Sequence, residues 1–511
     1  MLFEFSADSR PVSDLGVADV SRVLCAGSPL RGTREAMLHV LCTPETDSGA
    51  LRARQGDVRS VRGNDSLIEA SAESDFAWVM EYDVDDDLKE LLEAPFFDSF
   101  VTSWMNRVWF LLGANNAYGA VVSPAVALVT PILYLLSPIF IMRFRYGVKV
   151  GLVNYARLVY QSFRLGGDMI TLASGRSVSV ASMALSLAAA AFAYVQNVVN
   201  AVRHARNLYV ACEKITNKVE GACRFAKQAS AAMAASGWTV ARSERWASDG
   251  GAVAGDAGIP EALAGCGFRA YNPAFGRALV CFRSLDRARM RAFARHAALF
   301  DAARCASRSL DGGARFARYE GPGFLARGLR HPLVEGCVGN DVALGMGSPS
   351  VVLTGANASG KSTLMRSVAL ASVMAQSVTV CFCDAIAVRP VERVFTHMHV
   401  SDDVAEGKSR FQAEMANIGE IVANAESGRS CLLVVDELFS STTAAQSVVC
   451  LDGVLRRLAG FPGCMFVLAT HHEVGFEGVR RFRMETSGST LAHSYKMVPG
   501  VNEVFNAVYA P

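Results

Sequence analysis

Residues 351–363 read VVLTGANASGKST, and this stretch decides the fold of the carboxyl-terminal part of the chain. A short β-branched run is followed by Gly355, four further residues, Gly360 and Lys361, and then an apolar-periodic stretch typical of a helix. Glycines have no Cβ, so backbone N–H groups can converge on phosphate oxygens, and the helix N-terminus adds its dipole. The pattern predicts a phosphate-binding loop between a strand and a helix, and therefore a nucleoside triphosphate site.

The side chains of this loop have separate expected roles. Lys361 brings a positive charge to the phosphates, and the hydroxyl of Ser362 is expected to bind Mg²⁺. The loop residues expected to hold the nucleotide are Gly355, Gly360, Lys361, Ser362 and Thr363.

Two carboxylates follow an apolar run further along the chain. Residues 431–435 have the pattern of a parallel strand covered on both faces, and they end at Asp436 and Glu437. We expect Asp436 to hold the Mg²⁺ shell and Glu437 to polarise the attacking water. One β-α-β unit later, the strand expected at residues 465–469 leads to His471, which places this histidine beside the γ-phosphate. Taken alone, such a histidine more often packs in a core or a loop.

A resemblance to a known family lies between the loop and these carboxylates. Residues 393–415 read RVFTHMHVSDDVAEGKSRFQAEM and resemble the signature region of the MutS family of ATP-binding-cassette ATPases. Residues 330–334, RHPLV, match the start of the ATPase domain of that family. Residues 493–505, HSYKMVPGVNEVF, are similar to the strand pair that ends it. The resemblance covers residues 325–511, with separated motifs in the same order.

This resemblance implies a fold, cofactors, an assembly and further site residues. The implied fold is an α/β P-loop NTPase of the ATP-binding-cassette type, and the implied cofactors are ATP and Mg²⁺. In the family, a serine reaches across a dimer interface to the γ-phosphate of the partner, which assigns that role to Ser409. Asn357 matches the phosphate-loop asparagine of the family and is expected to bind nucleotide. The implied catalytic residues are then Glu437, His471 and Ser409.

The chain also departs from the family pattern. Residues 438–445, LFSSTTAA, replace the Gly- and Thr-containing loop that commonly communicates between the two ATP sites. The residues before position 325 are too few for the mismatch-reading, connector, lever and clamp modules of a full repair protein, and the sequence has no Phe-x-Glu wedge. We therefore expect DNA to be recognised by its structure and not by a mismatch.

Bulk composition is less informative than these motifs. A formal net charge of +2 over 511 residues gives no global basic signature, so any DNA contact must come from a local patch. The 13 cysteines lack the paired spacing of a disulfide framework, and no secretory signal is visible. These features predict an intracellular protein in a DNA-containing compartment. Cys381, Cys383, His397 and His399 alternate as strand residues do and lack the usual zinc-ligand spacing.

Four consecutive regions are expected along the chain. A polar region at 1–95 is followed by a hydrophobic helical region at 96–205, a basic, helical, lever-like region at 206–324 and the MutS-type ATPase domain at 325–511. The basic side chains of the third region would form either a solvated helix face or a DNA-facing surface. They are Arg283, Arg287, Arg289, Arg291, Arg295, Arg304, Arg308, Arg315 and Arg318.

The second region contains a stretch without charge, residues 108–142, which is long enough to cross a bilayer. Proline interrupts it at positions 124, 131 and 138. Because each proline inside a soluble helix costs about 3 kcal/mol, the stretch is either a broken helix buried in protein or membrane, or a series of short capped turns.

Residues 118–142 form the candidate membrane segment. The basic residues that follow, Arg143, Arg145 and Lys149, would place the carboxyl side of a single crossing in the cytoplasm. We expect a buried core element of the lever region before a single membrane anchor. A hairpin with the second uncharged stretch, 177–202, is expected least, since it would leave the ATPase on the side without ATP.

The sequence therefore predicts a MutS-like ATPase that binds DNA and couples ATP binding and hydrolysis at a homodimer interface to DNA repair or recombination. Two other functions stay open: a membrane-tethered ATPase that acts on protein partners, and an interaction protein that binds ATP with negligible hydrolysis.

Overall fold

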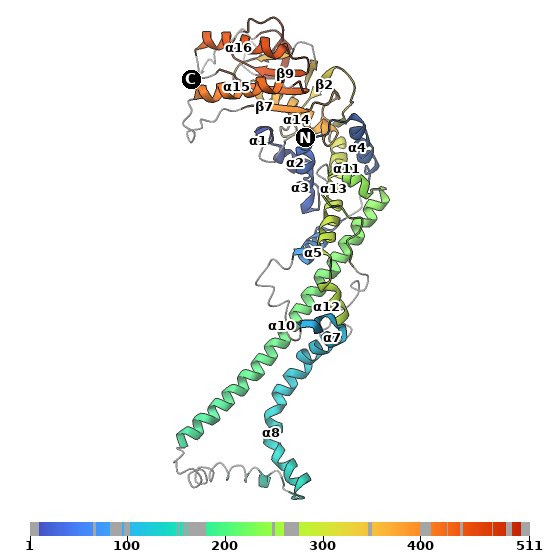
Figure 1. Ribbon diagram of the computed structural model, residues 1–511, viewed down its shortest axis with the longest axis vertical. Coiled ribbons are helices and arrows are strands. Elements are labelled where there is room, and N and C mark those ends of the chain that lie inside the picture. The colour runs from blue at the N-terminus through green and yellow to red at the C-terminus, as the bar shows by residue number, and fades with distance from the viewer. Residues whose placement is uncertain are drawn as a thin grey trace. The chain divides into compact units, whose positions relative to one another are not determined.

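The computed structural model of the protein is shown in Figure 1. It describes residues 10–64, 68–81, 95–96, 103–149, 151, 153–155, 157, 161, 180–247, 251–259, 275–345, 350–398, 410–426, 428–439, 443–472, 474–486 and 493–501.

The chain forms two compact units, each assembled from separated stretches. Unit 1 comprises Met1–Ala70, Lys227–Ala257 and Ala288–Pro511, and unit 2 comprises Ser71–Ala226 and Gly258–Arg287. The four consecutive regions expected from the sequence stay a prediction beside this division.

The largest sheet of unit 1 has six strands in the order β11-β10-β4-β9-β8-β7. All neighbouring strands are parallel except β10 and β11. The strands are β4 (Val351–Thr354), β7 (Arg393–His397), β8 (Cys431–Asp436), β9 (Cys464–Ala469), β10 (Arg480–Thr486) and β11 (His493–Pro499). Parallel strands of this kind are covered on both faces, which explains why β8 and β9 read as unbroken apolar runs.

Helices of unit 1 bury this sheet. Three of them connect its strands: α14 (Lys361–Gln376), α15 (Arg410–Glu426) and α16 (Ala444–Ala459). Alternate residues of β8, among them Leu433, pack with Ile421 of α15 and Leu455 of α16. The strand-loop-helix and strand-helix-strand orders expected at the phosphate loop and at the two carboxylates are thus present.

Two smaller sheets lie in the same unit. Strands β3, β2 and β6 form an antiparallel sheet, and β1 pairs with β5. Their bounds are β1 (Ala314–Phe316), β2 (Gly323–Leu329), β3 (Asn340–Gly345), β5 (Val380–Phe382) and β6 (Ala385–Val388).

Helices from earlier parts of the chain pack on the region that contains the six-stranded sheet within unit 1. Thr396 of β7 donates to Asp14 at 2.8 Å, the backbone N–H of Glu45 donates to the carbonyl of Gln376 at 2.6 Å, and Gln55 donates to the carbonyl of Ala317 at 2.6 Å. The helices of these parts are α1 (Arg10–Leu15), α2 (Val17–Leu24), α3 (Arg31–Cys42), α4 (Ser48–Ser60), α11 (Val240–Trp246) and α13 (Arg287–Asp311).

All the secondary-structure elements in the described part of unit 2 are helices. Its elements are α5 (Ala70–Glu81), η2 (Ser103–Arg107), α7 (Trp109–Ala117), η3 (Tyr118–Val122), α8 (Ser123–Arg145), α12 (Phe275–Arg283) and most of α10 (Val180–Ala235). The α8 helix continues through Pro131 and Pro138, so the expectation of short capped turns is wrong.

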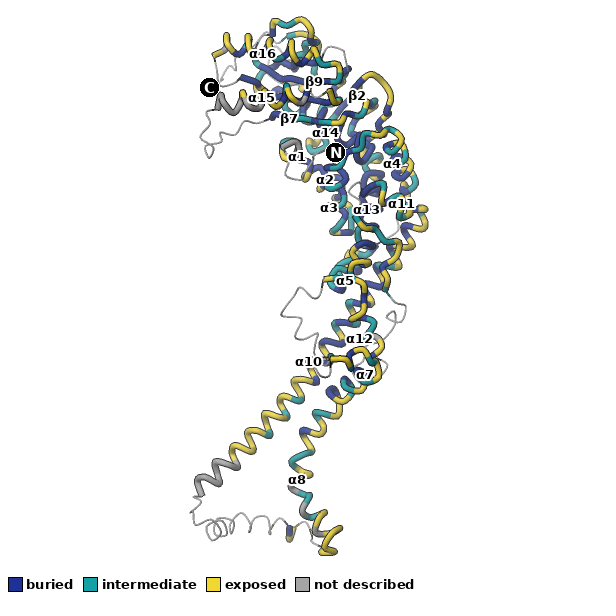
Figure 2. The backbone as a smooth tube through the Cα atoms, viewed as in Figure 1, coloured by how far each residue is buried: buried dark blue, intermediate teal, exposed yellow. Residues whose placement is uncertain are grey.

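The helix α8, whose residues 123–142 carry no charge, is mostly exposed, as the colouring of Figure 2 shows. Among the described residues, one helical stretch, Trp109–Leu133, is long and apolar enough to span a membrane, and only 22% of it is buried. The expectation of a buried core element is therefore wrong. The physical reason is that α10 reaches only one side of this helix.

Candidate functional site

The loop between β4 and α14 has the backbone that its glycines permit. Gly360, immediately before α14, has a φ of 97°. Residues with a Cβ rarely adopt this left-handed conformation, whereas glycine adopts it readily. A Cβ on Gly355 would lie 2.9 Å from Ser359 Oγ and 3.1 Å from Met484 Cβ. Both glycines therefore allow the loop to fold closely against the start of the helix.

Lys361 is the buried cation of this loop. Its ammonium donates to the carbonyls of Gly355 at 2.9 Å and Ala356 at 3.0 Å. Burial lowers the pKa of Lys361, while Glu437 and Asp436 oppose that shift. The lysine charge is thus aimed into the loop and close to both carboxylates that the sequence singles out.

Asp436, at the end of β8, meets the first turn of α14. Ser362 Oγ donates to Asp436 Oδ2 at 2.5 Å. The second carboxylate oxygen, Oδ1, is buried and has no hydrogen-bond partner among the described residues. Desolvation, more than any neighbouring charge, raises the pKa of Asp436. Since a buried carboxylate oxygen without a partner is costly, this pair has the chemistry of a cation site.

Mg²⁺ commonly binds one or two carboxylates together with phosphate oxygens. In the described part of the chain, no group of three or more His, Cys, Asp or Glu side chains could hold a metal by itself. A cation at Asp436 and Ser362 would therefore take its remaining oxygens from a phosphate ligand and from water.

Glu437 and His471 form a pair at the adjacent strand ends. His471 Nε2 lies 2.7 Å from Glu437 Oε1 and 3.3 Å from Lys361 Nζ. The shorter contact indicates that Nε2 carries the proton and donates to the carboxylate. The hydrogen bond with His471 is the largest cause that lowers the pKa of Glu437. This carboxyl group is accordingly held in its ionised form.

The backbone at Glu437 is also unusual. Its φ of 54° lies in the left-handed region, and its N–H donates to the carbonyl of Ala469 at 3.1 Å. A non-glycine residue in this region is strained, and such strain persists only where the surrounding structure imposes it. The turn directs the Glu437 side chain toward the loop.

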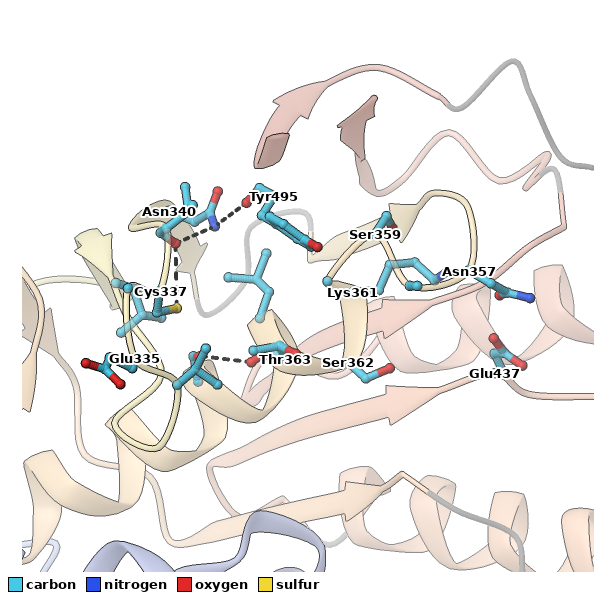
Figure 3. Close-up of a pocket in the computed structure, with 18 residues that line it drawn as sticks. Glu335, Cys337, Asn340, Asn357, Ser359, Lys361, Ser362, Thr363, Glu437 and Tyr495 are labelled. Carbon is cyan, nitrogen blue, oxygen red and sulfur yellow. Dashed lines mark hydrogen bonds between the residues drawn. The ribbon is translucent and has the colours of Figure 1, made fainter. Parts of the chain in front are cut away.

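Lys361, Ser362 and Glu437 line a cavity of about 500 Å³ in unit 1, and Asp436 and His471 contact these lining residues. Figure 3 shows Ser362 and Glu437 facing the same part of it, with Asn357 near Glu437 and Tyr495 on the other side of Lys361. Thr363 also lines the cavity.

The structure therefore brings together all the described residues that the sequence analysis selected for this site. Ser409 lies outside the described residues, and its role stays a prediction.

Several lining residues were missed in the sequence analysis. Tyr495 of β11 lines the cavity, and its carbonyl accepts from Asn340 at 2.9 Å. Residues 334–338 line the same cavity. Their positions in the sequence could have indicated them, because Tyr495 and residues 334–338 lie in or beside stretches that carry the family resemblance.

Comparisons with known proteins match the part of the chain that contains this site. Residues 351–488 match the family model described as MutS domain V. A DNA mismatch repair protein MutS 2 from Halobacterium salinarum is 38% identical over 158 residues, which are 30% of this chain and 18% of that protein.

Two further relatives match a similar length of the chain. The DNA mismatch repair protein MutS from Caldanaerobacter subterraneus is 33% identical over 186 residues, covering 34% of this chain and 21% of the relative. The DNA mismatch repair protein MSH6 from Saccharomyces cerevisiae is 33% identical over 188 residues, covering 35% of this chain and 14% of the relative. The chain thus spans about a fifth or less of the length of these relatives.

Proposed function

We propose, from the premise that this chain is a MutS-family protein with a MutS domain V at residues 351–488, that it binds and hydrolyses ATP at the cavity of unit 1. The proposal includes an α/β P-loop NTPase fold of the ATP-binding-cassette type. The strand β4, the glycine loop and the helix α14 support it, because they present backbone N–H groups and a helix N-terminus to one point.

The observation that carries the proposal is the Asp436–Ser362 pair. A buried carboxylate with one oxygen paired to a loop hydroxyl and the other unpartnered fits Mg²⁺ between the protein and a triphosphate. Mg²⁺, when bound, would neutralise charge on the phosphate oxygens. Gly355, Asn357, Gly360, Lys361, Ser362 and Thr363 would hold the phosphates, and all of them except Gly355 line the cavity.

Glu437 is the residue proposed to act on water. Its lowered pKa keeps it a carboxylate that accepts a hydrogen bond from the attacking water. His471, 2.7 Å away, orients this carboxylate, and Lys361 stabilises negative charge that develops on the phosphate. Hydrolysis then needs no covalent intermediate on the protein.

The Glu437→Gln variant tests hydrolysis separately from binding. It should bind Mg-ATP as the wild type does, while turnover falls by about 10²- to 10⁴-fold, the usual contribution of a positioned general base. Binding is measured with a fluorescent ATP analogue and turnover by phosphate release. Wild-type turnover in this variant would remove Glu437 from the proposed role.

The assembly belongs to the same proposal. We propose a homodimer in which Ser409 of one chain completes the ATP site of the other, as the family resemblance implies. Mixing Ser409→Ala protein with Glu437→Gln protein should then restore part of the activity, because one of the two sites in a mixed dimer has both side chains. Activity that stays proportional to protein on high dilution, without rescue on mixing, would show that each chain works alone.

The proposed partner is DNA in an intracellular compartment, and the proposed process is DNA repair or recombination. The structure of the DNA would determine binding more than the presence of a mismatch. The relatives are named as DNA mismatch repair proteins, and the α13 region supplies exposed basic groups. Three residues leave the expected set of nine. Arg304 is buried and lies 3.5 Å from Asp301, so it cannot face DNA, and Arg287 and Arg295 are only half-exposed. The exposed ones in unit 1 are Arg289, Arg291, Arg308, Arg315 and Arg318, and Arg283 is an exposed arginine of unit 2.

A further inference from the structure

Unit 2 exposes two helical segments that carry no charge. Residues 108–142, which include most of α8, and residues 177–202, which include the start of α10, contain no Asp, Glu, Lys or Arg. Large apolar side chains on both are open to solvent: Leu128 is 55%, Ile132 52% and Phe192 65% exposed. Isolated apolar residues on a surface are ordinary, but a continuous apolar surface of this length indicates an interaction site.

The two segments form an antiparallel helical hairpin. The hydroxyl of Tyr194 on α10 donates to the carbonyl of Leu128 on α8 at 3.1 Å. Nearer the base of the hairpin, Gly119 approaches so closely that a Cβ there would lie 2.9 Å from Leu208. This pairing covers one side of each helix only, and residues 188–193 of α10 are all exposed.

Because these helices are exposed on several sides, few kinds of partner could cover their apolar surface. A second copy of this chain would cover one stripe of each helix and leave the remaining apolar sides in water. DNA offers phosphate oxygens, which bind basic groups, and the hairpin helices have none along these stretches. A helix that is apolar all round belongs in a large core or in a lipid bilayer. Lipid is the occupant that contacts all free sides at once.

The two ends of the hairpin return to the same place. The chain leaves unit 1 after Ala70, forms the hairpin in unit 2, and re-enters unit 1 at Lys227. Asp14 and Glu45, before the hairpin, contact Thr396 and Gln376, after it, within unit 1. Any membrane that takes up these helices must therefore have both ends of the hairpin on one side. This arrangement argues against a single crossing, the second choice from the sequence, and requires the hairpin that was expected least. The connection of both hairpin ends to unit 1 is a direct structural constraint, and it outweighs the orientation that the basic residues after position 142 favour.

We propose that the hairpin of α8 and the first part of α10 inserts into a lipid bilayer, entering and leaving by the face on which unit 1 lies. The 23 residues of α8 correspond to about 35 Å of helix at 1.5 Å per residue, against about 30 Å of hydrocarbon. This association adds a membrane to the proposed ATPase and does not depend on hydrolysis.

The chemistry at the ends of α8 fits lipid headgroups. The exposed residues Arg143, Arg145 and Lys149 follow its apolar part, and the exposed Trp104 and Trp109 precede it. Basic groups bind anionic headgroups, and tryptophan prefers the interface between headgroups and acyl chains.

Vesicle flotation of the full-length chain tests this proposal. Purified protein is mixed with vesicles of phosphatidylcholine alone or with an added anionic lipid, then washed with high salt and with alkaline carbonate. The wild type should float with both vesicle types and resist both washes. A Leu128→Glu, Ile132→Glu, Phe192→Glu triple variant should lose at least tenfold of the floating fraction, because charged groups are costly in hydrocarbon.

A control variant, Val23→Glu with Val449→Glu, changes exposed valines of unit 1 and should float as the wild type does. Nucleotide binding by each variant reports whether unit 1 is folded. A Phe192→Trp variant keeps the apolar surface and supplies a second readout, since brominated acyl chains should quench the added fluorescence when position 192 lies in lipid.

Four results would overturn the proposal: wild-type protein that does not float, flotation that salt reverses, flotation that the triple variant retains, or no added quenching at position 192. Apolar self-association without lipid, or DNA binding abolished by the triple variant, would assign the surface to those partners instead. Each of these outcomes leaves the test of Glu437 unaffected, so failure here is distinguishable from failure of the ATPase proposal.

Discussion

Strand β8 of unit 1 and helix α8 of unit 2 each contain an uncharged apolar run, residues 431–435 and 123–142, yet the surroundings of the two runs differ. In β8, Cys431, Leu432 and Leu433 are all fully buried between layers of the same unit. In α8, Leu128 and Ile132 are more than half exposed. An apolar run therefore indicates a segment that avoids water. The rest of the fold determines whether other parts of the protein cover that segment or leave it exposed to a different partner.

Truncating one leucine in each region should give the largest contrast. Leu433→Ala removes buried methyl groups between β8 and its covering helices and should cost about 2–5 kcal/mol of unfolding free energy. Leu128→Ala, on the exposed side of α8, should change it by no more than about 0.5 kcal/mol in detergent solution. Denaturant unfolding followed by circular dichroism measures both. Equal losses would show that α8 is packed as tightly as the sheet.

A buried histidine of unit 1 should make the stability of the protein depend on pH, whereas an exposed histidine of unit 2 should not. Burial lowers the pKa of His296, in α13, from 6.5 to about 4, and its Nδ1 lies 2.7 Å from Ser243 Oγ. The unfolded chain then binds more protons than the folded chain between these two pH values, so stability falls as pH is lowered from 6.5 to about 4. The loss should reach about 3 kcal/mol, since one pKa unit corresponds to about 1.4 kcal/mol.

His296→Gln should flatten this acid limb, and His204→Gln, on an exposed part of α10, should leave it unchanged. Unfolding midpoints at pH 7 and pH 5 measure the difference. An identical pH dependence in wild type and His296→Gln would mean that water reaches this part of α13.

The exposed arginines should give the smallest effect per residue. Replacing Arg291, Arg315 and Arg318 by Glu should weaken DNA binding and lower the salt dependence of the binding constant by about 0.9 for each lost phosphate contact. Binding is followed by fluorescence anisotropy on branched and plain duplex DNA at several salt concentrations. A triple variant with wild-type affinity would remove this surface from DNA recognition.

The phosphate loop could be read from sequence because its chemistry is local. Gly355, Gly360, Lys361 and Ser362 lie within a few residues of one another, and the required backbone leaves few alternatives. Asp436 and His471 were also accessible, because adjacent parallel strands end at one edge of the sheet.

Other features depend on contacts between distant parts of the chain. Tyr495 reaches the loop only through the pairing of β11 with β10, and Asp14 meets Thr396 across most of the sequence. Neither contact leaves a local pattern. The exposure of α8 had the same difficulty, because its composition fits a protein core and a bilayer equally well.

The central claim is that the free oxygen of Asp436 is a Mg²⁺ ligand in an ATP site, and a Mg²⁺ titration of Asp436→Asn tests it most directly. Nucleotide binding is measured over a range of Mg²⁺ concentrations for this variant and the wild type, with a sample in EDTA for each. The Mg²⁺ concentration at half-maximal binding should rise at least tenfold in the variant, while binding in EDTA stays the same, because only the metal-dependent part is lost. An unchanged Mg²⁺ dependence would contradict the assignment of this site.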